Sequence, residues 1–316
     1  MQRECPFCPG NEHLLVEIVR EWPGAGAPGW SQRALYNKFP ALCPDAVPQD
    51  RDGVKSGRGW HWVLVDTPRH DRGLVAMSPD EATQLMIAYR DSYRQLAAMA
   101  GVCFVSVFQN HGSGAGASLR HPHSQLVAMQ MWPPAVVRSH EWLGGQARKM
   151  TGCPLCHHLA VTIAEASRLI EDQGGFVTMI PFAPVQPFEQ LIVPRRHAGS
   201  FETTTDEELR NLAGSLQRAL RRLDLLLGSP PFNLSLESIP SSESDPAISH
   251  WHVRVVPRLT TGGGFEQSTG TPIVPGAPES NAAQFRQLQV DRAGKCDLEG
   301  LPAFDTRGAP YGDGQG

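Results

Sequence analysis

The sequence predicts an α+β fold built from two tandem copies of one unit, each an antiparallel sheet packed with a helix. A Cys-x-x-Cys pair, a later histidine and a His-x-His segment recur in the same order in each half of the chain. Between the later histidine and the His-x-His, each half carries a helical apolar stripe and then a strand. Self-similarity over this length indicates a duplicated unit. We expect the halves to cover residues 1–150 and 151–286, and residues 287–316 to be a loosely ordered tail.

Length, charge and cysteine content exclude several classes of protein. The chain has 316 residues, enough for a substantial core, and its net charge of -4 gives no bulk attraction for nucleic acid. It has no apolar run of membrane-spanning length, and its first residues, MQRECPFCPG, lack a signal-peptide core. We expect a soluble, cytoplasmic protein that binds neither nucleic acid nor membranes. In that reducing compartment, paired cysteines indicate metal or redox chemistry rather than disulfides.

Helix signals appear at three places. One helix opens at Ser78, a capping residue followed by proline and two acids, and Gly101 ends it. Another opens at Thr205 and carries leucines at helical spacing as far as Gly228. A third is expected over residues 157–172, after the second Cys-x-x-Cys. The arginines of the second helix are expected on its solvated face: Arg218, Arg221 and Arg222.

The strongest functional signal is the segment NHGSGAGASLRHPHSQ, from Asn110 to Gln125. It follows an apolar, β-branched run at residues 102–108 that predicts a buried strand. Its glycines alternate with small residues, so backbone N–H groups can approach an anion closely. The candidate phosphate and nucleotide contacts in this loop are Asn110, Gly112, Gly116 and Ser118.

Two histidines follow the glycine loop. In an extended segment His121 and His123 point to the same face, because side chains alternate along a strand. One of them held by metal would leave the other free, and a neutral imidazole can attack a phosphorus atom and carry the nucleotide as a phosphoramidate. We assign that role to His123. Gln125 lies two residues on, on the same face, where its amide can donate a hydrogen bond to a phosphoryl oxygen but cannot act as an acid.

Each half supplies one tetrahedral Cys2His2 set, the usual ligand set of structural zinc. The alternative, a redox pair or a simple turn, is disfavoured because two correctly ordered copies are present. The later histidine of each set is chosen by its position in the repeat, and His61, His157 and His158 are expected to be solvated or packing residues. The predicted sets are Cys5, Cys8, His70 and His121, and Cys153, Cys156, His197 and His250.

The glycine loop and His-Pro-His-Ser-Gln resemble the histidine-triad superfamily, and within it the galactose-1-phosphate uridylyltransferase branch. The resemblance covers roughly residues 3–286. In that family the first histidine of the motif binds zinc and the second is the nucleophile, which here are His121 and His123. The two complete Cys2His2 sets and Ser124 are equally similar to the ADP-glucose phosphorylase subgroup.

The resemblance also implies roles outside the motif. Arg33 and Asn37, in the segment that continues to Leu42, match positions that contact the nucleoside. Glu266 matches a position that faces the sugar, and Asn233 matches the pattern of the second half. The family's fold implies a homodimer in which the Gly-Phe-Glu region of one subunit reaches toward the sugar site of the other.

Departures from the family leave three functions to weigh. A glutamine stands where the hydrolytic enzymes have a third histidine, which disfavours a nucleotide hydrolase. The intact loop and His123 disfavour a noncatalytic binding protein that is merely stabilised by zinc. Exchange of a nucleotide between an NDP-sugar and a sugar 1-phosphate or phosphate is favoured.

The second half has arginine, Arg254, at the glutamine position and no glycine loop, so it is expected to be structural. The base, the acceptor and the choice of zinc or iron in the second site stay open.

Overall fold

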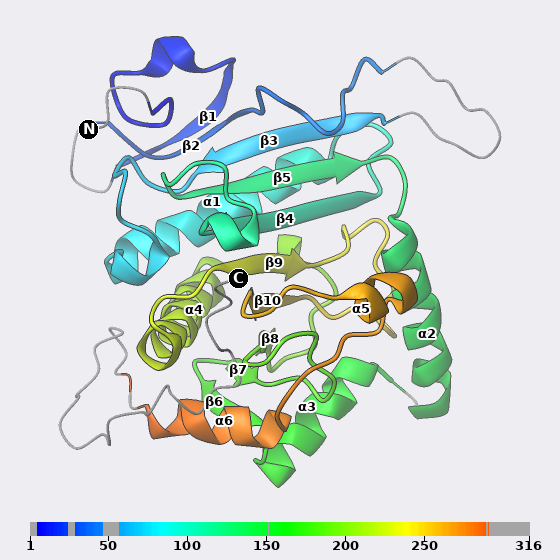
Figure 1. Ribbon diagram of the computed structural model, residues 1–316. Coiled ribbons are helices and arrows are strands. Elements are labelled where there is room, and N and C mark those ends of the chain that lie inside the picture. The colour runs from blue at the N-terminus through cyan, green and yellow to red at the C-terminus, as the bar shows by residue number, and fades with distance from the viewer. Residues whose placement is uncertain (1–4, 25–28, 47–56, 151, 289, 291–316) are drawn as a thin grey trace.

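Ten strands form one antiparallel sheet within the part of the chain that the computed structural model describes, residues 5–24, 29–46, 57–150, 152–288 and 290 (Figure 1). Their order is β1-β2-β3-β5-β4-β9-β10-β8-β7-β6. The strands are β1 (Ile18–Pro23), β2 (Trp30–Tyr36), β3 (Gly59–Val65), β4 (Phe104–His111), β5 (His123–Met129), β6 (Leu169–Gln173), β7 (Phe176–Met179), β8 (Gln190–Pro194), β9 (Phe232–Glu237) and β10 (His252–Pro257).

The strand order shows the duplication directly. Read from one edge, the first five strands run β1-β2-β3-β5-β4, and read from the other edge the last five run β6-β7-β8-β10-β9. The two sets join where β4 pairs with β9, with Val107 opposite Leu236. The predicted α+β fold with a large antiparallel sheet is therefore confirmed. The sheet runs through both halves without interruption, and the residue boundaries of the halves stay a prediction.

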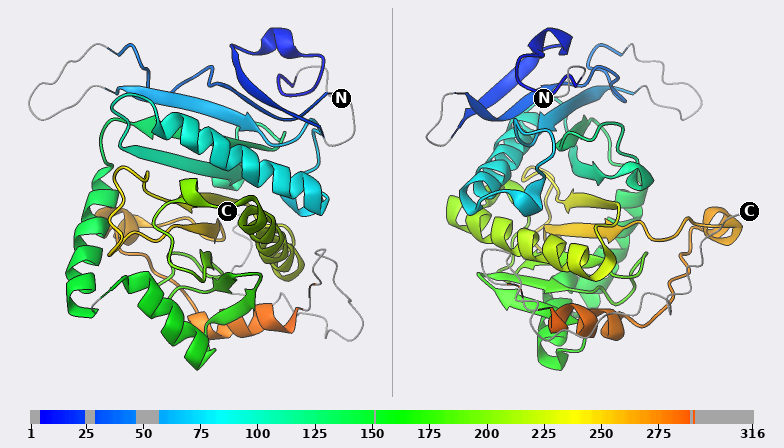
Figure 2. Two further views of the ribbon diagram at one scale, coloured as in Figure 1. Left: turned by 180° about the vertical axis from the view of Figure 1, so that it is seen from behind. Right: turned by 60° about the vertical axis from the view of Figure 1, so that its left-hand side comes forward.

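The main helices of the two halves lie side by side on one face of the sheet (Figure 2). One continuous cluster of buried side chains fills the space beneath them and includes Leu85 and Tyr93 from one helix and Leu216 and Leu220 from the other. The helices are α1 (Pro79–Ala97), α2 (Pro134–Met150), α3 (Pro154–Glu165), α4 (Asp206–Leu227), α5 (Gly264–Thr269) and α6 (Pro278–Gln287), with short 3-10 turns η1 (Glu12–Leu14), η2 (Leu74–Ala76), η3 (Ser113–Ala115) and η4 (Phe201–Thr203).

Both predicted helix starts are confirmed by their caps. The Ser78 hydroxyl accepts a hydrogen bond from the backbone N–H of Glu81, and Thr205 accepts one from Glu208. Each glutamate side chain accepts a bond from its cap's backbone N–H in return, so each helix begins with a capping box. Gly228 ends α4 with a φ of 70°, in the left-handed region that favours glycine.

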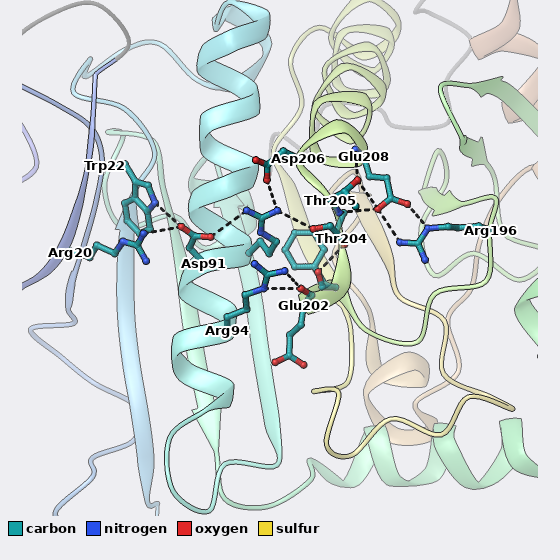
Figure 3. Close-up of polar contacts among 12 residues, drawn as sticks. Arg20, Trp22, Asp91, Arg94, Arg196, Glu202, Thr204, Thr205, Asp206 and Glu208 are labelled. Atoms are coloured by element: carbon teal, nitrogen blue, oxygen red, sulfur yellow. Dashed lines mark hydrogen bonds and ion pairs between the residues drawn. The ribbon is translucent and has the colours of Figure 1, made fainter.

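Polar contacts join α1 to the start of α4 (Figure 3). Arg90, in α1, donates to the backbone oxygen of Thr204 at 2.9 Å and to the Asp206 carboxylate at 2.6 Å. Arg94 donates through Nε to the backbone oxygen of Glu202 at 2.7 Å. Because these acceptors belong to the second half, the bonds fix the two halves of the sheet's helical layer to each other.

Two expectations about helices are wrong. Arg218 and Arg222 do not lie on a solvated face: both are buried and bind the carboxylate of Glu171, at 2.5 and 2.8 Å. An amphipathic stripe cannot reveal this, because the partner comes from β6. Helix α3 spans Pro154–Glu165 rather than residues 157–172, since a proline starts it directly after Cys153 and pairing of β6 with β7 makes residues 169–173 a strand.

Three further points concern the ends and edges of the fold. Helix α2, which the sequence did not reveal, runs along the side of the sheet (Figure 1). The predicted tail lies outside the described residues apart from Gln287, Leu288 and Val290. Within the described ranges, every helix is too short or too polar to cross a lipid bilayer.

Candidate active site and metal centres

The two side chains of β5 that were predicted to be catalytic lie on the face of the sheet opposite α1. Ser124 points toward α1, because its Oγ lies 2.5 Å from the hydroxyl of Tyr89. Side chains alternate along a strand, so His123 and Gln125 point to the other face. The sequence pattern predicted this pairing of the two residues on one face.

His123 is held in one orientation and one tautomer. It is the first residue of β5, it is buried, and its Nδ1–H donates to the backbone oxygen of His121 at 2.8 Å. A neutral ring bonded in this way keeps the lone pair on Nε2. Burial lowers the pKa of His123, which favours the neutral ring. The residue therefore presents an unprotonated nitrogen, as a nucleophile requires.

The first predicted Cys/His set is assembled. Its ligand atoms all lie within 4.8 Å of one another. Nδ1 of His121 is 3.6 Å from the sulfurs of Cys5 and Cys8, and Nδ1 of His70 is 3.4 Å from Cys8. Tetrahedral zinc with bonds of about 2.0–2.3 Å places its ligands roughly 3.3–3.8 Å apart, so these distances fit.

The surroundings of the first set also fit a metal ion. Nε2–H of His121 donates to the backbone oxygen of Thr67 at 2.8 Å, which leaves the Nδ1 lone pair facing the sulfurs. Burial raises the pKa of the Cys5 thiol, so a buried thiolate needs a compensating cation. His121 thus connects the candidate metal centre to His123, because its Nδ1 faces the sulfurs and its backbone oxygen orients the ring of His123.

The second predicted set is assembled in the same way. All four of its ligand atoms lie within 4.8 Å of one another, with Nδ1 of His250 3.4 Å from the sulfur of Cys156. Nε2–H of His250 donates to the backbone oxygen of Pro194 at 3.0 Å, the counterpart of the bond to Thr67. Burial raises the pKa of Cys156 to about 12, so this thiolate also requires a cation. Each half of the chain therefore holds one candidate metal centre.

The glycine loop follows β4 and needs its glycines at two positions. Gly112 and Gly116 have φ values of 79° and 86°, which side chains rarely adopt. Packing adds a third requirement for glycine, because a Cβ atom at Gly114 would lie 2.9 Å from the ring of Pro231 in the second half. The turn η3 between these glycines therefore packs closely against Pro231, the residue that precedes β9.

A residue of the second half holds this loop. The side-chain amide of Asn233, in β9, donates to Oδ1 of Asn110 at 2.8 Å and to the backbone oxygen of Ala115 at 2.9 Å. Arg258 donates to Oδ1 of Asn233 in turn. The resemblance pointed to Asn233 without a stated role, and the geometry shows it clamping both ends of the turn.

Two cavities meet at His123. The larger, about 1040 Å³, is lined by the glycine loop and the segment around His70, including Asn110, Gly112 and Ser118. The smaller, about 470 Å³, is lined mostly by apolar side chains and by Asn37 and Gln125. Ser118 and His123 line both. A ligand with two dissimilar ends joined at a reactive centre fits this arrangement.

Three residues predicted to contact the substrate line neither cavity: Gly116 of the glycine loop, Arg33 and Glu266. Arg33 is buried and binds the carboxylates of Glu21 and Glu12 at 2.6 and 3.2 Å, while its guanidinium lies over the ring of Trp30. Glu266, in α5, accepts a bond from the backbone N–H of Gly263, and the right-hand view of Figure 2 shows α5 standing away from the sheet. Their roles in binding nucleotide and sugar stay predictions.

One polar residue of the site was missed. His61, in β3, was expected to be a solvated or packing residue, yet it is buried and its Nε2 lies 3.0 Å from Oε1 of Gln125. In β3 it lies two residues before Val63, which pairs with Gln125 across the sheet. Alternation along the strand could have placed it on the Gln125 face, but strand pairing is not visible in the sequence.

The second half lacks a matching reactive pair. His252 repeats the geometry of His123, since its Nδ1–H donates to the backbone oxygen of His250 at 3.2 Å. Arg254 stands where Gln125 does, and it binds the buried carboxylate of Glu189 at 2.6 Å. This ion pair occupies the place of the amide, in line with the expected structural role of the second copy.

A buried carboxyl group lies behind the catalytic strand. Asp66 accepts hydrogen bonds from Oγ of Ser124 at 2.9 Å and from the amide of Gln109 at 2.6 Å. Burial raises the pKa of Asp66 to about 7, although these two bonds oppose the rise. Asp66 thus ties the end of β3 to β4 and β5 on the α1 face of the sheet, opposite the face of His123 and Gln125.

Sequence comparisons show to which proteins this chain is similar. The family described as galactose-1-phosphate uridyl transferase, N-terminal domain, matches residues 2–133. An ADP-glucose phosphorylase of Arabidopsis thaliana is 30% identical over 295 residues, which cover 90% of this chain and 82% of that protein. A galactose-1-phosphate uridylyltransferase of Thermotoga maritima is 26% identical over 301 residues, which cover 91% of this chain and 90% of that protein.

Solved structures are similar over the same length. The crystal structure of an Arabidopsis thaliana ADP-glucose phosphorylase with bound ADP-glucose has a TM-score of 0.82 and 29% identity, and covers 92% of each chain. A solved uridylyltransferase has a TM-score of 0.78 and 25% identity, and covers 91% of each chain. The agreement spans both halves of the chain. This chain therefore belongs to the family of nucleotidyltransferases that includes ADP-glucose phosphorylase and galactose-1-phosphate uridylyltransferase.

Proposed function

We propose that the chain transfers a nucleoside monophosphate between an NDP-sugar and a second phosphate compound through His123. The observation that carries the proposal is the bond from Nδ1–H of His123 to the backbone oxygen of His121, which leaves Nε2 unprotonated where the two cavities meet. The smaller, mostly apolar cavity suits a nucleoside. The larger cavity, with the glycine loop, suits the phosphates and the sugar.

The transfer takes place in two displacements. Nε2 of His123 attacks the α-phosphorus, a P–N bond forms, and the bond from that phosphorus to the bridging oxygen breaks. The sugar 1-phosphate leaves with the bonding electrons on its oxygen. A phosphate oxygen of the acceptor then attacks the same phosphorus, and the P–N electrons return to Nε2. Both leaving and attacking groups are phosphates, which need little protonation, so no general acid is required.

Gln125 supports transfer rather than hydrolysis. Its amide can donate to a phosphoryl oxygen and stabilise charge that develops on phosphorus, but it has no proton to give to a leaving group. The nucleotidyl enzyme then lasts long enough for a phosphate acceptor to arrive. A nucleotide hydrolase of the histidine-triad type is disfavoured on this ground.

Two pairs of substrates are supported. Relatives named galactose-1-phosphate uridylyltransferase favour uridylyl exchange between UDP-glucose and a hexose 1-phosphate. The relative named ADP-glucose phosphorylase favours an ADP-sugar as donor and inorganic phosphate as acceptor. The cavities accommodate either reading, because His123 acts on the α-phosphate in both.

We assign zinc to both Cys2His2 sets and a structural role to each ion, since thiolate and imidazole in a closed tetrahedron are its usual structural ligands. We also propose a homodimer in which Glu266 of one subunit approaches the sugar site of the other, in keeping with the position of α5 away from the sheet. The reduced thiol ligands favour the cytoplasm.

The substrate test is an acceptor assay with four combinations. The purified protein is incubated with UDP-glucose or ADP-glucose, and with galactose 1-phosphate or inorganic phosphate. Exchange between UDP-glucose and galactose 1-phosphate, releasing glucose 1-phosphate and UDP-galactose, identifies a uridylyltransferase. Conversion of ADP-glucose and phosphate to ADP and glucose 1-phosphate identifies a phosphorylase. Release of free nucleoside monophosphate in every combination, without transfer, would contradict the proposed function.

A further inference from the structure

His61 lies between the proposed nucleoside pocket and the catalytic amide. The backbone N–H of Asn37 donates to the backbone oxygen of His61 at 2.9 Å, and the backbone N–H of Ala41 donates to its ring Nδ1 at 3.0 Å. On the other side of the ring, Nε2 lies 3.0 Å from Oε1 of Gln125. Both ring nitrogens are therefore occupied, one by the segment that lines the smaller cavity and one by Gln125.

The backbone donor decides the tautomer of His61. Because Ala41 donates to Nδ1, that nitrogen carries the lone pair, and the proton of the neutral ring lies on Nε2. Nε2–H then donates to Oε1 of Gln125. The amide of Asn37 also lies 3.1 Å from Nε2, but its oxygen accepts from Phe39, so the group that faces the ring is its NH2, a donor; of the two amides, that of Gln125 offers Nε2–H an acceptor. Burial lowers the pKa of His61, which keeps the ring neutral.

The tautomer in turn decides how Gln125 is oriented. With its oxygen bound to His61, the amide of Gln125 has its NH2 group directed elsewhere, and within the described part of the chain that nitrogen has no hydrogen-bond partner. If the amide were reversed, Nε2–H would face the NH2 groups of both Asn37 and Gln125 and would lose its acceptor. The free NH2 group belongs to a side chain that lines the same cavity as His123, where the phosphoryl group reacts.

We propose that His61 is a positioning residue that fixes the amide of Gln125 with its NH2 group toward the reacting phosphate and couples this orientation to the segment Asn37–Leu42. The inference rests on the proposed function, because it needs a phosphoryl oxygen to receive the bond from Gln125. A nucleoside seated against Asn37 would order the segment that holds Nδ1 of His61. The catalytic amide is then aligned by the same segment that binds the nucleoside.

Two substitutions distinguish the role of Nδ1 of His61 from that of Nε2. In His61→Asn the side-chain amide nitrogen lies about as far from the backbone as Nδ1 of the native ring, and in His61→Gln it lies about as far as Nε2. Formation of labelled nucleotidyl enzyme in a single turnover is measured with whichever of UDP-glucose and ADP-glucose labels the wild type. We expect His61→Asn to slow this step on the order of tenfold, and His61→Gln to restore the rate to within about threefold. The apparent affinity for the donor should change less than the rate.

A double-mutant cycle shows whether His61 acts through Gln125. In a Gln125→Ala background, His61→Asn should cause no further loss, because the amide that it positions is absent. His140→Asn is the control, since that histidine lies in α2 against Trp132 and lines neither cavity. Metal content and thermal unfolding of each variant show whether the fold is kept.

Three outcomes would overturn the inference alone: a wild-type rate for His61→Asn, equal loss in the two His61 variants, or the same loss with and without Gln125. Each would assign His61 a packing role. Absence of label on the wild-type protein with both donors would instead overturn the proposed function, and this inference with it.

Discussion

The side-chain amide of Asn233 lies 2.8 Å from Oδ1 of Asn110, and this bond joins the two copies of the repeat at the glycine loop. Asn110 belongs to the half that carries His123, whereas Asn233 belongs to the half whose own site is filled by the ion pair of Arg254 and Glu189. The second copy thus holds the loop to which the proposed function assigns the phosphates.

Replacement of Asn233 tests that support. Asn233→Ala removes the bonds to Asn110 and Ala115, so the loop is held less firmly and the phosphates are misplaced. We expect kcat/KM to fall roughly 10- to 100-fold, the usual cost of small misplacements in an active site. Steady-state kinetics measures the effect. Asn211→Ala, a half-buried amide of α4 outside both cavities, is the matched control, and an equal loss in both variants would argue against a specific clamp.

The two metal centres should differ in what their removal does. Cys153→Ser should lower the free energy of unfolding by about 4 kcal/mol or more, the contribution of a ligand present at roughly 1,000 times its Kd, with kcat less affected. Cys8→Ser should lower stability and also kcat, because Cys8 contacts His121, whose backbone oxygen orients His123. Elemental analysis should give two metal ions in the wild type and one in each variant. A wild-type chain with one ion or none would contradict the assignment.

Stability should respond to pH through Asp66. Its pKa is raised from 3.8 to about 7 in the folded chain, so the folded state holds a proton that the unfolded state releases. The free energy of unfolding should therefore rise as the pH falls through about 7, by up to about 1.4 kcal/mol per pH unit. It should stop rising near pH 3.8, the pKa of this carboxyl group in the unfolded chain. Asp66→Asn should remove this dependence. Denaturant titrations of the wild type and the variant across that pH range measure the free energy of unfolding of each. A difference in this free energy that does not change with pH would show that Asp66 does not titrate there.

Gln125 should decide between transfer and hydrolysis. A histidine at this position can hold a proton near neutral pH and give it to a leaving group. We expect Gln125→His to slow transfer and to increase release of free nucleoside monophosphate relative to transfer. Product analysis with and without a phosphate acceptor measures the ratio. If the ratio is unchanged, selectivity lies elsewhere, such as in exclusion of water by the sugar site near Glu266.

The sequence was sufficient for features that depend on residue type and spacing. The two Cys/His sets recur in order, so the positions of His70 and His197 could be inferred from the repeat, and both sets are assembled in the fold. The capped starts of α1 and α4 could be identified because a cap depends on only a few adjacent residues. The face shared by His123 and Gln125 follows from alternation along one strand.

Features that depend on contacts between distant segments were not visible. His61 gains its role from Ala41 and Gln125, which reach it only when β3 pairs with β5. Helix α2 was missed because Gly144 and Gly145 lie in its interior, where glycine disfavours a helix, and in the fold Ala147 is its only buried residue among those described. The order of the strands, which brings Asn233 to the glycine loop, has no local signal at all.

The most direct measurement is retention of the α-phosphate of a donor on the protein. UDP-glucose and ADP-glucose, each labelled at that phosphorus, are incubated separately with the wild type, with His123→Ala and with His252→Ala. The last is the matched control, because His252 has the same backbone bond in the half without a glycine loop. We expect one of the donors to leave acid-labile label on the wild type and on His252→Ala, and none on His123→Ala with its fold and metal content intact. Label that persists on His123→Ala, or turnover by that variant at a substantial fraction of the wild-type rate, would contradict the role of His123.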